Sequence, residues 1–194
     1  MDNSDALRGK WDRRHRANDR PVLPATVLTR NAHLLPDRGT ALDLACGLGG
    51  NALFLAERGL TVSAWDLSPV AAGRVRAEAE TRGLKIASQA RDIIARPPPP
   101  SSFDVIVVSH FLDRRLAPAI AWALRPGGLL FYQTFAREAV TDQGPSNPEF
   151  RLDHNELLRL FAGLVVRVYR DEGRLGNLSR GTRDLAMLVA QRVE

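Results

Sequence analysis

TALDLACGLGGN, residues 40–51, sets three glycines directly behind a short apolar run. This pattern predicts a buried strand over residues 40–45, a turn at Gly47, Gly49 and Gly50, and a helix over residues 52–58 that ends at Gly59. A strand, a glycine turn and a helix in this order place backbone N–H groups and a helix N-terminus against a ligand without intervening side chains. We therefore expect a ligand site at this turn.

The glycine spacing alone permits two kinds of ligand. Gly47-x-Gly49-x-x-Ala52, with Asp66 further along the chain, satisfies the dinucleotide-binding pattern. Asp43, however, lies at the carboxyl end of the predicted strand, where its charge would repel a pyrophosphate across a short gap. The same carboxylate would attract a ligand with an amino group and no phosphate, such as S-adenosylmethionine (SAM).

Several segments together resemble the class I SAM-dependent methyltransferase family, and their order is more specific than any one of them. Residues 43–49 resemble the first motif of that family, Asp66 its ribose-binding acid, and residues 91–93 its adenine-binding segment. Residues 103–109, followed by residues 124–128, resemble its fourth strand and the turn into its fifth. The resemblance covers residues 38–135, and the chain ends resemble the small bacterial methyltransferases related to the tellurite-resistance and thiopurine methyltransferases.

The resemblance implies a single α/β domain over residues 1–194. We expect a doubly wound, mainly parallel, seven-stranded sheet with helices on both faces and a reversed final strand, a Rossmann-like methyltransferase fold. Residues 1–36 would form an N-terminal lid segment that folds across the cofactor, with His15 where an aromatic residue is more usual. Residues 136–152 would form a loop that covers the substrate.

Turn and capping residues place the other elements. Ser68 and Pro69 predict a helix start, and Asp153 with Glu156 resembles a capping box. Four consecutive prolines at residues 97–100 leave no room for a helix after the third strand. The last two strands are joined by a polar loop, so we expect them to pair antiparallel. The expected strands cover residues 60–65, 85–88, 103–109, 129–135, 164–169 and 185–190, and the expected helices cover residues 70–82, 113–123 and 155–161.

The resemblance also assigns roles within the site. Asp66 would accept the two ribose hydroxyls and Asp92 the adenine amino group, and Asp43 would bind the methionine ammonium directly or through water. Ser109 and His110 would border the methyl group, Cys46 would be a packing residue, and Asp104 a solvated turn residue. The expected cofactor-binding set is Asp43, Ala45, Cys46, Gly47, Gly49, Asn51, Asp66, Leu67, Asp92, Ile93, Ser109 and Trp11, with no metal.

Methyl transfer from a sulfonium is an in-line displacement, in which the protein aligns and desolvates donor and acceptor. A base is needed only if the acceptor arrives protonated. By pKa the candidates are His110, His154 and His15. We take His110 as the catalytic candidate, and the acceptor atom stays open.

The amino-acid composition and charge indicate which classes of partner to consider. The net charge of +5 and a pI of about 10.3 come from 27 basic residues, 25 of them arginine. A nucleic-acid methyltransferase therefore stays an alternative, although Ser109-His110-Phe111-Leu112 stands where an Asn-Pro-Pro-Tyr tetrad would be expected. A nicotinamide-binding protein is a second alternative, but the tyrosine–lysine reductases are excluded because neither Tyr132 nor Tyr169 is followed four residues on by lysine.

We expect a cytoplasmic enzyme with a small-molecule methyl acceptor, present as a monomer or weak dimer. The chain has no apolar run long enough for a membrane span, its start lacks the order of a signal peptide, and its one cysteine excludes intrachain disulfides.

Overall fold

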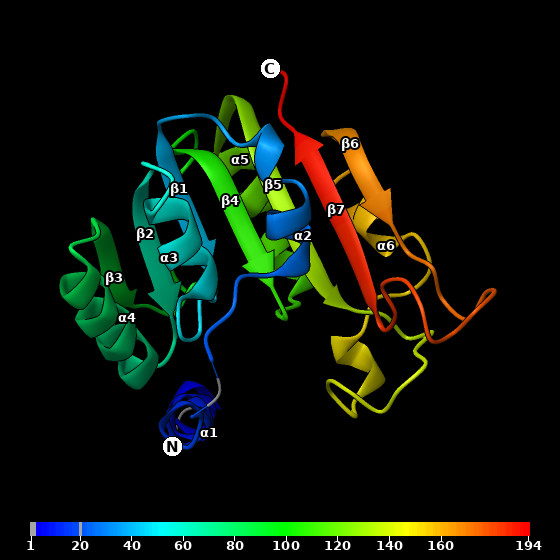
Figure 1. Ribbon diagram of the computed structural model, residues 1–194, viewed down its shortest axis with the longest axis horizontal. Helices are drawn as coiled ribbons and strands as arrows, with labels where there is room; N and C mark the ends of the chain where they lie inside the picture. The colour runs from blue at the N-terminus through cyan, green and yellow to red at the C-terminus, as the bar shows by residue number, and fades with distance from the viewer. Residues whose placement is uncertain (1–2, 20) are drawn as a thin grey trace.

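The computed structural model describes residues 3–19 and 21–194; Met1, Asp2 and Arg20, part of the expected lid segment, lie outside the described residues. Seven strands form one sheet in the order β3-β2-β1-β4-β5-β7-β6 (Figure 1). β1 to β5 pair in parallel, and β7 pairs antiparallel with both β5 and β6. The strands are β1 (Thr40–Leu44), β2 (Thr61–Asp66), β3 (Ile86–Ala90), β4 (Phe103–Ser109), β5 (Leu124–Phe135), β6 (Val165–Arg170) and β7 (Leu185–Gln191). The expected sheet, with its reversed final strand, is confirmed.

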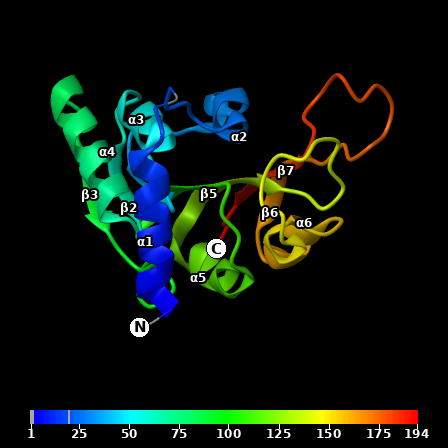
Figure 2. The ribbon, with the colours of Figure 1, turned by 90° about the horizontal axis from the view of Figure 1, so that it is seen from below.

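Helices cover both faces of the sheet (Figure 2). α2, α3 and α4 pack on one face against the side chains of Val105, Val107 and Phe131, and α5 and α6 pack on the other against those of Ile106 and Leu130. This alternation follows from the period of two along a strand. The helices are α1 (Asn3–Arg16), α2 (Thr26–Arg30), α3 (Gly50–Ala56), α4 (Pro69–Arg82), α5 (Ala117–Ala123) and α6 (Glu156–Leu160). Three short 3₁₀ turns cover Ala32–Leu34, Arg114–Leu116 and Pro148–Phe150. Among residues 3–19 and 21–194, no helix is long and apolar enough to cross a membrane.

The second half of the expected lid segment belongs to the core. Val27 and Leu28, in α2, are fully buried, and the Val27 N–H donates to Gln133 Oε1 at 2.9 Å. This short helix was not predicted, because prolines surround it and because a five-residue helix has little periodicity to detect. The lid prediction is therefore limited to α1 and the residues directly after it, and it stays a prediction.

Several element boundaries differ from the expected ones. α3 begins at Gly50, two residues earlier than expected, and β3 extends to Ala90. β5 begins at Leu124, because Leu124 pairs with Phe103 ahead of an irregular register. Asp113 caps a 3₁₀ turn by accepting from Arg115 N, and α5 follows at Ala117 with Pro118 in its first turn.

Asp104 is not the solvated turn residue that we expected. Its Oδ2 accepts hydrogen bonds from Thr40 N at 2.7 Å and from Arg125 Nη1 at 2.9 Å. Partial burial would raise the pKa of Asp104, but the hydrogen bonds from Thr40 and the nearby Arg125 guanidinium lower it below its usual value. Asp104 therefore joins the amino ends of β1, β4 and β5.

The C-terminal elements agree with the prediction in outline. Glu156 Oε2 accepts from Asp153 N at 2.8 Å, which is half of the expected capping box, while the Asp153 carboxylate accepts from His154 N instead. Hydrogen bonds hold the loop over residues 136–152: the buried Asp184 accepts from Thr141 N at 3.0 Å, and the partly buried Arg151 donates from Nη1 to Ala136 O at 3.0 Å. Its role as a substrate cover stays a prediction.

Candidate functional site

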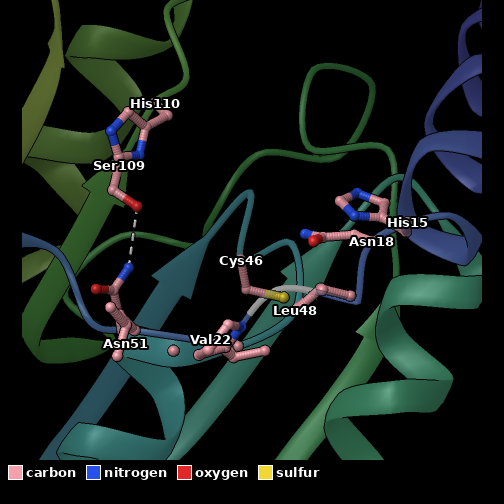
Figure 3. A pocket seen from close by; sticks show the side chains of 12 residues that line it. His15, Asn18, Val22, Cys46, Leu48, Asn51, Ser109 and His110 are labelled. Carbon is pink, nitrogen blue, oxygen red and sulfur yellow. Dashed lines mark hydrogen bonds between the residues drawn. The ribbon is translucent and has the colours of Figure 1, made fainter.

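A cavity of about 260 Å³ lies at the carboxyl edge of the sheet, between α1, the glycine turn and the end of β4 (Figure 3). Five residues of the expected cofactor site line it, counting the catalytic candidate: Cys46, Gly49, Asn51, Ser109 and His110. The structure therefore brings the turn after β1 and the end of β4 to one opening, as parallel strands require.

The glycine turn gives a bare backbone at the floor of the cavity. Gly47 and Gly49 adopt positive φ angles of 51° and 83°, which residues with a side chain rarely adopt. A Cβ atom on Gly49 would lie 2.6 Å from Val75 Cγ2, so this position also needs glycine for space. Ala45, just ahead of the turn, takes a φ of 55°. The positive φ angles and the close contact with Val75 therefore restrict which residues this turn can contain.

Asp66, at the end of β2, is held against this turn. Its Oδ2 accepts from Gly47 N at 2.9 Å, its Oδ1 accepts from Ser68 N at 2.9 Å, and the residue is 7% exposed. A carboxylate oxygen has two lone-pair sites, so each oxygen can still accept a ligand hydroxyl. The two backbone donors fix the orientation of the carboxylate, and its contact with a ribose stays a prediction.

Asp43 lies beneath the turn rather than in the cavity wall. It has no exposed surface, and its carboxylate accepts from Asn51 Nδ2 at 3.2 Å and from Ala52 N at 3.0 Å. Burial raises the pKa of Asp43 to about 7; the two hydrogen bonds oppose this rise, and the charge of Asp66 adds to it. Asn51 stands between Asp43 and the cavity, so the contact of Asp43 with a ligand ammonium stays a prediction.

The orientation of the Asn51 amide makes the Ser109 hydroxyl oxygen the acceptor in the hydrogen bond between the two residues. The Ala25 N–H donates to Asn51 Oδ1 at 2.8 Å, which turns the Asn51 amide nitrogen toward Asp43 and Ser109. Rotating the amide by half a turn would set donor against donor and oxygen against carboxylate. Asn51 Nδ2 therefore donates to Ser109 Oγ at 3.1 Å (Figure 3). The hydroxyl hydrogen of Ser109 has no acceptor in the described part of the chain and is available to a ligand.

His110 follows Ser109 at the mouth of the cavity. Its backbone has a φ of 55°, and its ring lies 5.2 Å, centroid to centroid, from that of Phe135. Desolvation by the surrounding protein lowers the pKa of His110, which keeps the imidazole neutral at neutral pH. A neutral imidazole can accept a proton, so the arrangement suits the catalytic role that we predicted. His154, another base candidate, lies outside the cavity, exposed beside Glu138.

The remaining predicted residues lie near the cavity but do not line it. Asp92 Oδ1 accepts from Ile94 N at 3.0 Å, and Arg91 N donates to Asp66 O at 2.7 Å, so the segment after β3 lies beside Asp66. Their cofactor contacts stay predictions. The lining formed by the described residues does not include Asp43, Gly47 or Asp66, nor does it include Trp11, Ala45, Leu67, Asp92 or Ile93.

The N-terminal segment contributes further lining residues. His15, a base candidate named above, projects into the cavity from the last turn of α1, and Asn18 projects into it from just after that helix (Figure 3). Asn18, Pro21, Val22 and Leu23 also line the cavity and were not predicted individually. His15 Cε1 lies 3.5 Å from the position of a Cβ atom on Gly47, directly over the turn. Trp11, His15 and Asn18 are spaced four and three residues apart, and this helical spacing could have identified the face of α1 that meets the site.

Comparison with known proteins shows similarity to methyltransferases. Residues 41–128 match the methyltransferase domain family. A curated relative, the ubiquinone biosynthesis O-methyltransferase of Azoarcus sp. (strain BH72), is 33% identical over 154 residues, which are 76% of this chain and 57% of the relative. The chain spans about half the length of the curated relatives it matches.

Two solved structures share the fold. TehB from Haemophilus influenzae is 21% identical with a TM-score of 0.70, and the match covers 94% of this chain and 67% of that one. Geranyl diphosphate C-methyltransferase from Streptomyces coelicolor A3(2), in complex with Mg²⁺, geranyl diphosphate and S-adenosyl-L-homocysteine, is 16% identical with a TM-score of 0.70, covering 100% and 99% of the two chains. At these identities the likeness concerns the fold alone.

Proposed function

We propose that this chain, which belongs to the class I SAM-dependent methyltransferase family, transfers a methyl group from SAM to a small-molecule acceptor. The observation that carries the proposal is the Asp66 carboxylate, held by Gly47 N and Ser68 N beside the glycine turn. This arrangement suits a ribose and offers an anion, rather than a phosphate-binding group, to a cationic ligand.

The residues of the chain then take the following roles. When bound, SAM supplies an electrophilic methyl group on a sulfonium, whose departure needs no proton. Asp66 orients the ribose, the bare backbone of the turn lets the methionine part approach, and the Ser109 hydroxyl donates to an oxygen in the cavity. Neutral His110 is placed to take a proton from an acceptor that arrives protonated.

Two observations support a small acceptor. The curated relative is named for an O-methyltransferase of ubiquinone biosynthesis, and the structural neighbour from Streptomyces coelicolor for a C-methyltransferase of geranyl diphosphate. A nucleic acid is the alternative acceptor, favoured by the exposed arginines of α1 such as Arg13 and Arg14. A methyl-transfer screen over phenols, thiols, oxyanions of selenium and tellurium, and tRNA separates these; salt-sensitive methylation of tRNA alone would favour the alternative.

The choice of cofactor can be measured directly. We expect calorimetric titration to show binding of SAM and of S-adenosylhomocysteine and no binding of NADH, because the buried Asp43 lies beneath the glycine turn, where its charge would repel the pyrophosphate of a dinucleotide. Tight binding of NADH without binding of SAM would overturn the proposed function.

Asp66→Ala should weaken SAM binding by about 1–3 kcal/mol, because the charge-assisted hydrogen bonds to the ribose are lost. The matched control is Asp104→Ala, which removes a strand-end carboxylate that also accepts a backbone N–H, but at the opposite edge of the sheet. Asp104→Ala should lower thermal stability and leave the SAM dissociation constant unchanged. Equal SAM affinity in the wild type and in Asp66→Ala would remove Asp66 from the site.

A further inference from the structure

α1 and α4 lie side by side, and α4 supplies a cap for the end of α1 (Figure 2). The last carbonyl groups of a helix have no partner within it. Arg74, in α4, donates from Nη1 to the carbonyl oxygen of His15 at 2.6 Å and to that of Asn18 at 3.0 Å. Its guanidinium also places positive charge at the negative end of the α1 dipole.

α1 in turn contributes to the N-terminal cap of α4. Ser68 is the N-cap of α4: its Oγ accepts from Ala71 N at 3.2 Å. The Ser68 hydroxyl donates in turn to Asp12 Oδ1 of α1, which also lies 3.5 Å from Val70 N. The Asp12 carboxylate thus brings negative charge to the positive end of α4. Each helix caps the other through one charged side chain.

This reciprocal capping acts at the cavity. The two carbonyl groups that Arg74 holds belong to His15 and Asn18, the residues of the α1 end that line the cavity. Trp11 stacks on His15 with ring centroids 5.8 Å apart. Some hydrogen bonds link α1 to another element through a side chain. Within the described residues, all of these bonds join α1 to α4 or to its N-cap, Ser68.

We propose that Arg74 and Asp12 are positioning residues for the cofactor, which keep α1 docked on α4 so that His15 and Asn18 close the cavity over the glycine turn. This inference rests on the proposed function. Neither residue lines the cavity, so both act through the position of α1. A bound ligand must then wait for α1 to detach before it leaves, and the two capping contacts set how often that happens.

The test measures SAM association and dissociation separately by stopped-flow fluorescence, using Trp11 and the other tryptophans as reporters. Arg74→Ala should speed dissociation about fivefold, as expected for loss of exposed hydrogen bonds from a charged group, with little change in the association rate. The control is Arg76→Ala on the same helix, whose Nη2 donates at 3.4 Å to Ser88 O on β3. Arg76→Ala should leave both rates unchanged.

A double substitution tests whether the two residues act together. Asp12→Ala should also speed dissociation, and Arg74→Ala combined with Asp12→Ala should speed it more than either substitution alone, because each contact stabilises the docked helix. A dissociation rate equal to that of the wild type in Arg74→Ala, or a double variant no faster than Asp12→Ala alone, would overturn the inference.

A readout without cofactor separates this inference from the proposed function. Trypsin should cut α1 after Arg13, Arg14 or Arg16 faster in Arg74→Ala than in the wild type or Arg76→Ala, while the urea midpoint of the remaining domain stays the same. If the wild type fails to bind SAM, the proposed function falls and the proteolysis still reports on docking. If the wild type binds SAM but α1 is cut equally fast in all three proteins, only the docking inference falls.

Discussion

Replacing Asp43 by alanine should lower the free energy of unfolding by about 2–5 kcal/mol, because two buried donors lose their acceptor. The donors are Asn51 Nδ2 and Ala52 N, both at the start of α3, and Asp43 itself has no exposed surface. Urea denaturation of both proteins provides the measurement. A loss below about 1 kcal/mol would show that the contacts of Asp43 are not structural.

The pH dependence of stability tests the state of Asp43. Its pKa is raised by burial to about 7 in the folded protein, against an ordinary value near 4, so the folded state binds its proton more tightly than the unfolded state. The contribution of this group to the free energy of unfolding is therefore fully present below about pH 4 and is lost as the pH rises through about 7. Asp43→Asn should flatten the stability profile between these values.

Cofactor binding should shift the same proton. SAM carries a net positive charge at neutral pH, and its approach to the turn above Asp43 favours the carboxylate over the acid. Calorimetry in buffers of different ionisation enthalpy should therefore detect proton release on SAM binding near pH 7. S-adenosylhomocysteine, which lacks the sulfonium charge, should release less, and Asp43→Asn should release none. Equal release by the two ligands would contradict this coupling.

The positions of most strands and the ligand-binding edge were predictable, because they depend on local patterns. The glycine turn follows a buried strand, Ser68 and Pro69 start α4, and an all-apolar run forms the central strand β4. Each signal is complete within about ten residues of sequence. The carboxyl ends of parallel strands then bring Asp66 and Ser109 to one edge without further information.

The contacts that were not predicted join residues far apart in the sequence. Asp104 was taken for a solvated residue because its partners, Thr40 and Arg125, are 64 and 21 residues away. The hydrogen bond from the Asn51 amide to Asp43, eight residues earlier, was not predicted either. Arg74 reaches the end of α1 across 59 residues. Local pattern identifies the residue types of such pairs but not which partner each one finds.

Gly50 offers a steric test of how the N-terminal segment is seated on the site. A Cβ atom at this position would lie 2.3 Å from Leu23 O and 2.7 Å from Leu23 C, both backbone atoms that no side-chain rotation can move. Gly50→Ala must therefore displace the segment that contains Val22 and Leu23, which line the cavity, and Ala25, whose N–H orients Asn51.

We expect Gly50→Ala to lower the free energy of unfolding by about 3 kcal/mol, the upper part of the range for overpacking, because the clash is with backbone. SAM binding should weaken as well, since the Asn51 amide loses the donor that orients it toward Ser109. Gly73→Ala is the matched control: Gly73 lies inside α4, and apart from its chain neighbours and the backbone of its own helix, no atom of the described residues lies within 4 Å of the added Cβ.

Gly73→Ala should raise stability by about 0.5–1 kcal/mol, because alanine loses less backbone entropy than glycine in a helix. The two variants add the same methyl group, so opposite signs in urea denaturation isolate the contact with Leu23 as the cause. If Gly50→Ala were as stable as Gly73→Ala, residues 22–25 would be free to move away from the glycine turn, and Asn51 could not hold Ser109 in the orientation that presents its hydroxyl to the cavity.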